Sequence, residues 1–146
     1  MGMTGWAEYI ISNGQGFNKV MDGVDAETAL SIFALPGLTA TQGMSIIKSK
    51  AGETLIVTGA AGSVGSIVGQ MAKADGMRVI GVVGSDEKAD WIVNTLGFDG
   101  AINYKTDDLE AKLAELTPNG IDAFFENTGG PIQNHIFARM NAHGRI

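Results

Sequence analysis

Cysteine is absent from this 146-residue chain, and histidine occurs only twice, at His135 and His143. Without cysteine the chain can form no disulfide, thiolate nucleophile or cysteine-ligated zinc site, and two histidines are too few for a histidine cluster. We therefore expect no metal site. Basic residues are also scarce, with ten Lys and Arg against sixteen Asp and Glu and a net charge of −6. Because no diffuse basic surface is available, we expect neither nucleic acid nor an anionic membrane as a partner.

Residues 1–16, MGMTGWAEYIISNGQG, lack both a basic start and a long apolar stretch. They resemble neither a signal peptide nor a membrane anchor, so we expect a cytoplasmic protein. Hydrophobic residues make up 45% of the sequence and charged residues 18%, which is typical of a globular chain. A domain of this length buries roughly 68–70% of the surface that its unfolded chain exposes.

From residue 54 onward, apolar runs alternate with helical patterns. The expected strands are 54–58 (TLIVT), 78–83 (RVIGVV), 101–104 (AINY) and 121–126 (IDAFFE). After each strand, apolar residues recur at helical spacing: Val64, Ile67, Val68, Met71 and Ala72; then Trp91, Ile92, Thr95 and Leu96; then Leu109, Leu113 and Leu116; then Ile132, Ile136, Phe137 and Met140. Four strand–helix repeats with continuously apolar strands predict a doubly wound α/β fold (Rossmann), with a parallel sheet covered on both faces.

The two ends of the chain do not follow this alternation of strands and helices. GWAEYIIS at 5–12 indicates a strand, and helical patterns follow at 26–34 and 38–48, separated by a Pro-Gly pair. AHGRI at 142–146 indicates a turn and the first residues of a fifth strand. We therefore expect an incomplete sheet in a portion of a longer protein.

The stretch GAAGSVG at 59–65 joins the first expected strand to the first helix. A dinucleotide diphosphate needs a tight turn out of a strand, a backbone free of side chains, and a helix N-terminus with free N–H groups. In the G-x-G-x-x-G register Ala60 takes the first position, Gly62 lets the phosphates approach, and Gly65 lets the helix lie close to the strand. The pattern predicts a dinucleotide-binding turn; glycines that only pack a strand against a helix are the alternative.

Two other nucleotide-binding families fit less well. Read from Thr58, the turn spells T-G-x-x-G-x-x-G, as in extended short-chain dehydrogenases, but 57 residues precede it. Neither tyrosine has the Lys four positions on that those enzymes use, since Tyr9 is followed by Asn13 and Tyr104 by Asp108. A methyltransferase would usually carry an acid at the end of its second strand, and this sequence does not.

The end of the second expected strand bears on the choice of cofactor. NAD-selective sites place Asp or Glu about 20 residues beyond the glycines, where it binds the ribose 2′-hydroxyl. Here that position holds Gly84 and Ser85, followed by Asp86, Glu87 and Lys88. Ser85 is placed to cap a helix, and Lys88 one turn in can attract a 2′-phosphate. NADP is favoured over NAD, with a solvated Lys88 as the alternative.

In addition, the sequence resembles the zinc-independent medium-chain dehydrogenase/reductases, and among them the prostaglandin reductase (leukotriene B4 12-hydroxydehydrogenase) group. The matching stretches run in order along most of the chain: LPGLTA at 35–40, KAGETLIVTGAAGSVGSIVGQMAK at 50–73, VVGSDEKADWI at 82–92, LGFDGAINYKT at 96–106, FFENTGG at 124–130 and GRI at 144–146. The resemblance implies that residues 1–23 are the remnant of a GroES-like catalytic domain and that residues 24–146 are an NADP-binding Rossmann domain.

By resemblance, seven residues contact the cofactor. Gly62, Ser63, Val64 and Gly65 correspond to the diphosphate turn, Lys88 to a lysine that binds the 2′-phosphate, Tyr104 to a tyrosine near the adenosine, and Asn127 to an asparagine at the sheet edge. The alternatives are a packed ring for Tyr104 and a turn residue for Asn127. No catalytic acid or base can be named.

The function implied by the resemblance is NADPH-dependent reduction of the C=C bond of α,β-unsaturated ketones or aldehydes, by hydride transfer to the β-carbon. An NADPH-dependent quinone reductase and a non-catalytic NADP(H)-binding module are the alternatives. The implied partners are a small-molecule enone, enal or quinone and, for the full-length protein, a second copy in a homodimer. We expect the isolated chain to have little or no activity.

Overall fold

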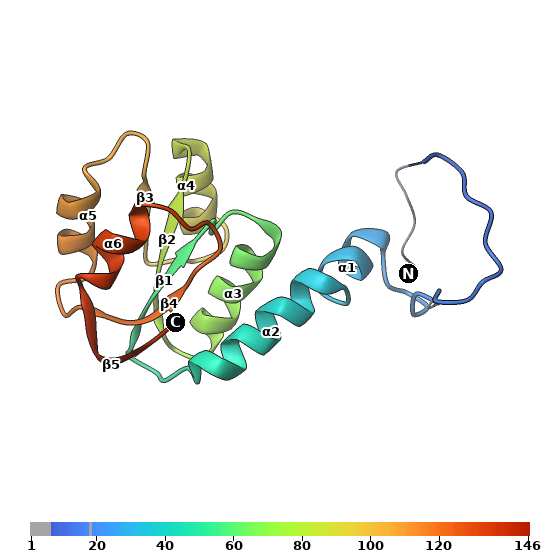
Figure 1. Ribbon diagram of the computed structural model, residues 1–146, viewed down its shortest axis with the longest axis horizontal. Coiled ribbons are helices and arrows are strands. Elements are labelled where there is room, and N and C mark those ends of the chain that lie inside the picture. The colour runs from blue at the N-terminus through green and yellow to red at the C-terminus, as the bar shows by residue number, and fades with distance from the viewer. Residues whose placement is uncertain (1–6, 18) are drawn as a thin grey trace.

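The computed structural model describes residues 7–17 and 19–146. Its centre is a parallel sheet of five strands in the order β3-β2-β1-β4-β5 (Figure 1). The strands are β1 (Thr54–Thr58), β2 (Arg78–Val83), β3 (Gly100–Asn103), β4 (Ile121–Phe125) and β5 (Met140–Arg145). The chain runs outward in one direction through β1, β2 and β3 and then returns to the other side of β1 as β4. The predicted Rossmann-type parallel sheet is confirmed.

Six helices lie in the described part of the chain: α1 (Ala26–Ser31), α2 (Leu35–Ile47), α3 (Ser63–Ala74), α4 (Asp86–Asn94), α5 (Leu109–Leu116) and α6 (Ile132–Phe137). Buried residues of α2, α3 and α4 form one apolar cluster with the sheet. Residues of α5 and α6 form a second cluster with the opposite face. The sheet is thus covered on both sides, as the doubly wound pattern predicts.

The three central residues of β1 are all apolar, and their positions in the structure explain why. Leu55 and Val57 belong to the cluster with α2, α3 and α4, whereas Ile56 belongs to the cluster with α5 and α6. All three side chains are fully buried. Because successive residues of a strand point to opposite faces, only a sheet covered on both faces requires every position to be apolar.

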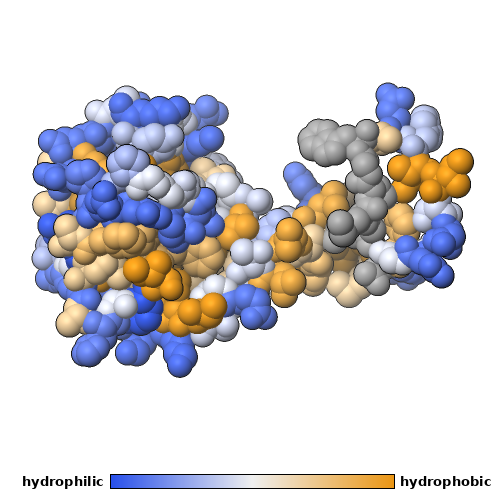
Figure 2. Space-filling view, viewed as in Figure 1, coloured by the Kyte–Doolittle hydropathy of each residue, from blue (hydrophilic) through white to orange (hydrophobic). Residues whose placement is uncertain are grey.

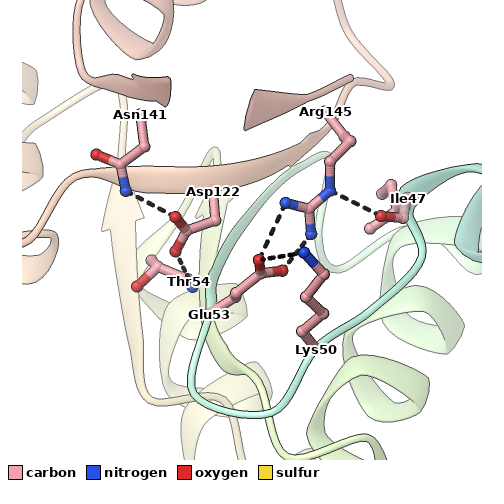
Figure 3. Close-up of polar contacts among 7 residues, drawn as sticks. All are labelled: Ile47, Lys50, Glu53, Thr54, Asp122, Asn141 and Arg145. Carbon is pink, nitrogen blue, oxygen red and sulfur yellow. Dashed lines mark hydrogen bonds and ion pairs between the residues drawn. The ribbon is translucent and has the colours of Figure 1, made fainter. Parts of the chain in front are cut away.

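Polar contacts join β5 to the segment that precedes β1 (Figure 3). The Arg145 guanidinium donates from Nε to the Ile47 carbonyl at 2.8 Å and pairs with the Glu53 carboxylate through both terminal nitrogens. Asp122 on β4 accepts from the Thr54 N–H at 2.9 Å and from the Asn141 amide at 2.7 Å. These bonds fix the edge strand β5, whose pairing with β4 is irregular.

Apolar side chains on α1 and on the first half of α2 are exposed. Figure 1 shows α1 and this half of α2 extending away from the sheet, and Figure 2 shows apolar residues along them. They include Leu30 on α1 and Leu35 and Leu38 on α2, and Ile32 and Phe33 in the connection between the two helices are exposed as well; each of the five is more than half exposed. The longest helix of the described residues, α2, has 13 residues, whereas a bilayer span needs about 20. None of the described helices could span a membrane.

Several predicted boundaries are corrected by the structure. No strand forms within residues 7–12, and residues 5 and 6 lie outside the described part. The sheet ends at β3 on one side and at β5 on the other, so no strand of the sheet pairs with residues 7–12. A strand without a partner is not stable in water. Met140 does not continue α6, which ends at Phe137; it begins β5, two residues before the predicted turn. Tyr104 follows β3 instead of ending it.

The predicted break at Pro36-Gly37 is also wrong. Helix α2 begins at Leu35 and continues through both residues, with the proline in its first turn. Proline is compatible with that turn because its missing N–H would have no intrahelical acceptor there. The helix pattern therefore starts three residues earlier than expected, and α1 ends at Ser31, earlier than the predicted residue 34.

Candidate functional site

A pocket of about 510 Å³ lies at the carboxyl ends of the central strands. We call it the edge pocket. It is lined by Thr58, Gly59, Ala61, Gly62, Val82, Val83, Gly84, Lys88, Tyr104, Lys105, Thr128, Gly129 and Ile132. These residues follow or end β1, β2, β3 and β4. The pocket thus lies where the strand order reverses between β1 and β4, which is the usual ligand position in an open parallel sheet.

The glycine turn after β1 is shaped by close backbone contacts. Gly59 has φ +59°, a left-handed conformation that favours glycine. A Cβ on Gly65 would lie 2.5 Å from the Gly59 carbonyl oxygen and 2.8 Å from the Ala60 Cα. Gly65 is therefore required for the start of α3 to lie against the turn. Gly62 lines the pocket and is exposed, so the backbone is open to a ligand there.

Helix α3 begins at this turn without a side-chain cap. Its N-cap is Gly62, which has no side chain to accept a hydrogen bond, whereas Ser85 caps α4 and Asp108 caps α5. The first N–H groups of any α-helix have no intrahelical acceptor, and the helix dipole makes this end favourable for an anion. In α3 these groups belong to Ser63, Val64 and Gly65. The turn can therefore hold a phosphate group beside the pocket.

A second part of the pocket is cationic and aromatic. Lys88 lies in the first turn of α4, where Ser85 Oγ accepts a hydrogen bond from the Lys88 N–H at 3.3 Å, as predicted. Tyr104 and Lys105 follow β3, and the Tyr104 side chain is 45% exposed. The Lys105 Nζ lies 6.0 Å from the centroid of the Tyr104 ring. Two ammonium groups and a phenol can thus contact an anionic group of a ligand in the pocket.

The third wall of the pocket is a loop after β4 that Glu126 holds in place. Its Oε1 accepts hydrogen bonds from the Thr58 hydroxyl at 2.8 Å, the Gly129 N–H at 2.8 Å and the Thr128 N–H. The other oxygen, Oε2, is buried and so is closed to a ligand. Asn127 donates from its side-chain amide to the Thr58 carbonyl at 2.9 Å. These bonds join the ends of β1 and β4 and fix the loop.

The ionisation of Glu126 is coupled to this loop. Burial alone would raise the pKa of its carboxyl group, but the hydrogen bonds from Thr128, Gly129 and Thr58 outweigh burial and lower the pKa below its ordinary value. A carboxylate with a lowered folded-state pKa stabilises the fold fully above its unfolded-state pKa, about 4.3. This contribution is lost as the pH falls through the lower folded-state pKa.

We expect Glu126→Gln to lower the free energy of unfolding by about 1–3 kcal/mol at pH 7, because three hydrogen bonds to a charged acceptor become weaker bonds to a neutral amide. The difference from the unmodified chain should shrink as the pH falls from about 4 through the lowered folded-state pKa of Glu126, because the native carboxyl then becomes protonated too. Denaturant unfolding at several pH values measures both effects. A difference that is constant from pH 7 to pH 3 would contradict the role of the charge.

The seven predicted contact residues fall into three groups. Gly62, Lys88 and Tyr104 line the edge pocket. Ser63, Val64 and Gly65 lie just behind it in the first turn of α3, where only their backbone N–H groups are relevant. Asn127 does not line the pocket, and its amide is bonded to Thr58, although the next two residues do line it.

Sequence reasoning missed Lys105, Thr58 and Glu126. Lys105 could have been found, because it follows a predicted strand and every such residue lies at the carboxyl edge of a parallel sheet. Thr58 and Glu126 are 68 residues apart, and no local pattern signals that they meet.

The residues present do not fit a zinc site. The sequence has no cysteine, and the described part of the chain brings no three His, Asp or Glu side chains together. We assign no metal chemistry to these residues.

Three known proteins are similar to this chain over nearly its whole length. Prostaglandin reductase 1 from Bos taurus is 46% identical over 98% of this chain and 45% of its own length. A 2-alkenal reductase (NADP⁺-dependent) from Nicotiana tabacum is 44% identical over 99% of this chain and 43% of its own length. The crystal structure of CurA from Vibrio vulnificus in complex with NADPH superposes with a TM-score of 0.89 at 42% identity, covering 97% of this chain and 43% of CurA.

The chain therefore spans less than half the length of each of these relatives. The family model described as zinc-binding dehydrogenase matches residues 63–146, which is more than half of the chain. The match begins at the first residue of α3 and includes strands β2 to β5. The chain belongs to the zinc-binding dehydrogenase family.

Proposed function

We propose that this chain is the NADP(H)-binding part of an oxidoreductase that reduces the C=C bond of α,β-unsaturated ketones or aldehydes. The observation that carries the proposal is the edge pocket, which combines an uncapped helix N-terminus with a separate cationic wall. These two features match the two anionic parts of NADP(H), its diphosphate and its 2′-phosphate. The names of the relatives, a prostaglandin reductase and a 2-alkenal reductase, support the substrate class.

Each residue has a defined part in this proposal. The backbone N–H groups of Ser63, Val64 and Gly65 bind the diphosphate, and Gly62 keeps the approach free of side chains. Lys88 binds the 2′-phosphate and Tyr104 lies beside the adenosine. Asn127 acts through the backbone of Thr58, to which its amide is bonded. NADPH, when bound, supplies the hydride. The protein residues bind and orient the cofactor, and none is assigned as a proton donor.

The domain division and the assembly belong to the same proposal. Residues 1–23 are the remnant of a GroES-like domain and residues 24–146 the cofactor domain. This division is supported by the start of α1 at Ala26. We also propose a cytoplasmic, homodimeric full-length protein that acts on a small molecule. In that protein the substrate would bind between the two domains, so the chain alone should show little or no turnover.

We expect the chain to bind NADPH at least about fivefold more tightly than NADH, because a single added phosphate charge near Lys88 is worth on the order of 1–4 kcal/mol. Calorimetric titration of the chain with each cofactor measures this ratio. The full-length protein, given NADPH, should consume an enone such as 1-octen-3-one. Equal affinity for the two cofactors would contradict the assignment of Lys88.

Two further outcomes separate the alternatives. Reduction of a quinone without any enone turnover would favour a quinone reductase. Tight NADPH binding by the full-length protein with no turnover of either acceptor would favour a non-catalytic NADP(H)-binding module.

A further inference from the structure

The end of β2 carries Gly84, at the position where NAD-selective sheets carry an acid. A Cβ on Gly84 would lie 3.2 Å from both Cε1 and Oη of Tyr104 and 3.5 Å from Cε of Lys105. The space into which the side chain of an acid would extend is therefore occupied by Tyr104 and by the stem of Lys105. An ammonium group thus stands near the place that a carboxylate takes in NAD-selective sites.

A buried amide holds the turn that carries Lys105. Asn103, only 4% exposed, accepts a hydrogen bond from the Lys105 N–H at 3.2 Å through its side-chain oxygen. Its side-chain nitrogen donates to the Asp86 carboxylate at 2.7 Å. Asp86 is in the first turn of α4, two residues before Lys88. The Asn103 side chain therefore joins the turn after β3, which carries Lys105, to the start of α4, which carries Lys88.

Two acids, Asp86 and Glu87, precede Lys88 in the first turn of α4, and neither lines the edge pocket. One Asp86 carboxylate oxygen is bonded to the Asn103 amide. Lys88 and Lys105 both line it. The cationic side of the pocket thus contains two ammonium groups from two different elements.

Resting on the proposed function, we propose that Lys105 is a second specificity-determining cation, which together with Lys88 recognises the 2′-phosphate of NADP(H). Lysine suits this role because its flexible stem lets the ammonium reach the phosphate from an exposed turn. The Lys105 stem lies beside the Tyr104 phenol, so the ring limits the directions open to the ammonium. An exposed ion pair is worth up to about 1 kcal/mol, or about fivefold in affinity.

The test compares two fragments of the cofactor, adenosine 2′,5′-bisphosphate and adenosine 5′-monophosphate. Calorimetric titrations of the chain with each, at constant ionic strength, give the ratio of their Kd values. Lys105→Met should weaken binding of the bisphosphate about three- to fivefold and change binding of the monophosphate by less than twofold. Lys105→Arg should keep the native ratio. Lys112→Met on α5, which removes a half-exposed lysine that is paired with Glu115 and does not line the pocket, is the control for the loss of one positive charge.

The outcomes distinguish this inference from the proposed function. If Lys105→Met left the ratio of the two Kd values unchanged while Lys88→Met reduced the preference for the bisphosphate, the role of Lys105 would be overturned. The proposed NADP site would then still hold. Equal weakening of both fragments would also overturn the inference, because Lys105 would then act on the 5′-phosphate side. If the unmodified chain bound the two fragments equally, the proposed preference for NADP would fail, and the role of Lys105 with it.

Discussion

Gly65→Ala should lower the free energy of unfolding of this chain by about 3 kcal/mol or more. The new methyl group would lie 2.5 Å from the Gly59 carbonyl oxygen and 2.8 Å from the Ala60 Cα, which are backbone atoms of the turn itself. Overpacking a core typically costs 1–3 kcal/mol, and here no flexible side chain can move aside. A whole domain is stable by only about 5–15 kcal/mol, so the loss is a large part of the total. Guanidinium unfolding of both proteins measures it.

The predicted loss of stability is opposite in sign to the change that helix propensity alone predicts. In the first turns of a helix, glycine is a poor residue, and helix propensity alone would predict that alanine stabilises by up to about 1 kcal/mol. Gly62→Ala is the matched control, because its Cβ would meet only one atom, the Gly59 carbonyl oxygen at 3.1 Å. Gly62 has φ −82°, which alanine adopts without strain. We expect Gly62→Ala to cost less than about 1 kcal/mol. A stabilised or unchanged Gly65→Ala protein would show that α3 can move away from the turn.

The structure explains which elements the sequence could predict. The bounds of β1 and β2 match the predicted ranges because both strands are buried on both faces, so the apolar run and the strand end together. The start of β5 was mispredicted because Met140 has the helical spacing of Ile136 and Phe137. Its pairing with Ile121 depends on a residue 19 positions earlier. The segment at 7–12 has the residues of a strand but no neighbour, and composition cannot reveal whether a partner is present.

The same division between local and distant information applies to the candidate site. The glycine turn, the Ser85 cap and Lys88 lie within short stretches, and spacing alone predicted their places. The loop held by Glu126 depends on Thr58, 68 residues away, and the link between the turn that carries Lys105 and the start of α4 depends on the bond between Asn103 and Asp86. The absence of an acid at Gly84 favoured NADP from the sequence. Only the structure shows that Tyr104 and Lys105 fill that space.

Lys88→Glu should reverse the cofactor preference of the chain. The substitution replaces attraction of the 2′-phosphate by repulsion, and each part is worth on the order of 1–2 kcal/mol at a partly screened site. We therefore expect the Kd for NADPH to rise about a hundredfold, while the Kd for NADH changes less than about threefold because NADH has no charge at that position. Calorimetric titration at low and at physiological salt measures both, and the effect on NADPH should be smaller at the higher salt concentration.

Folding and general charge are controlled separately in this experiment. Lys88 is exposed, and its backbone N–H, not its side chain, is bonded to Ser85, so Lys88→Glu should leave the free energy of unfolding nearly unchanged. An acid in the first turn of α4 is favourable for the helix dipole. Lys112→Glu makes the same change in net charge on α5, away from the edge pocket. If Lys112→Glu weakened NADPH binding as much as Lys88→Glu did, the preference would depend on the net charge of the chain, and Lys88 would be a solvated lysine. A large effect of Lys88→Glu alone requires the 2′-phosphate to lie beside α4, since screening by salt limits a surface charge to roughly 8–10 Å.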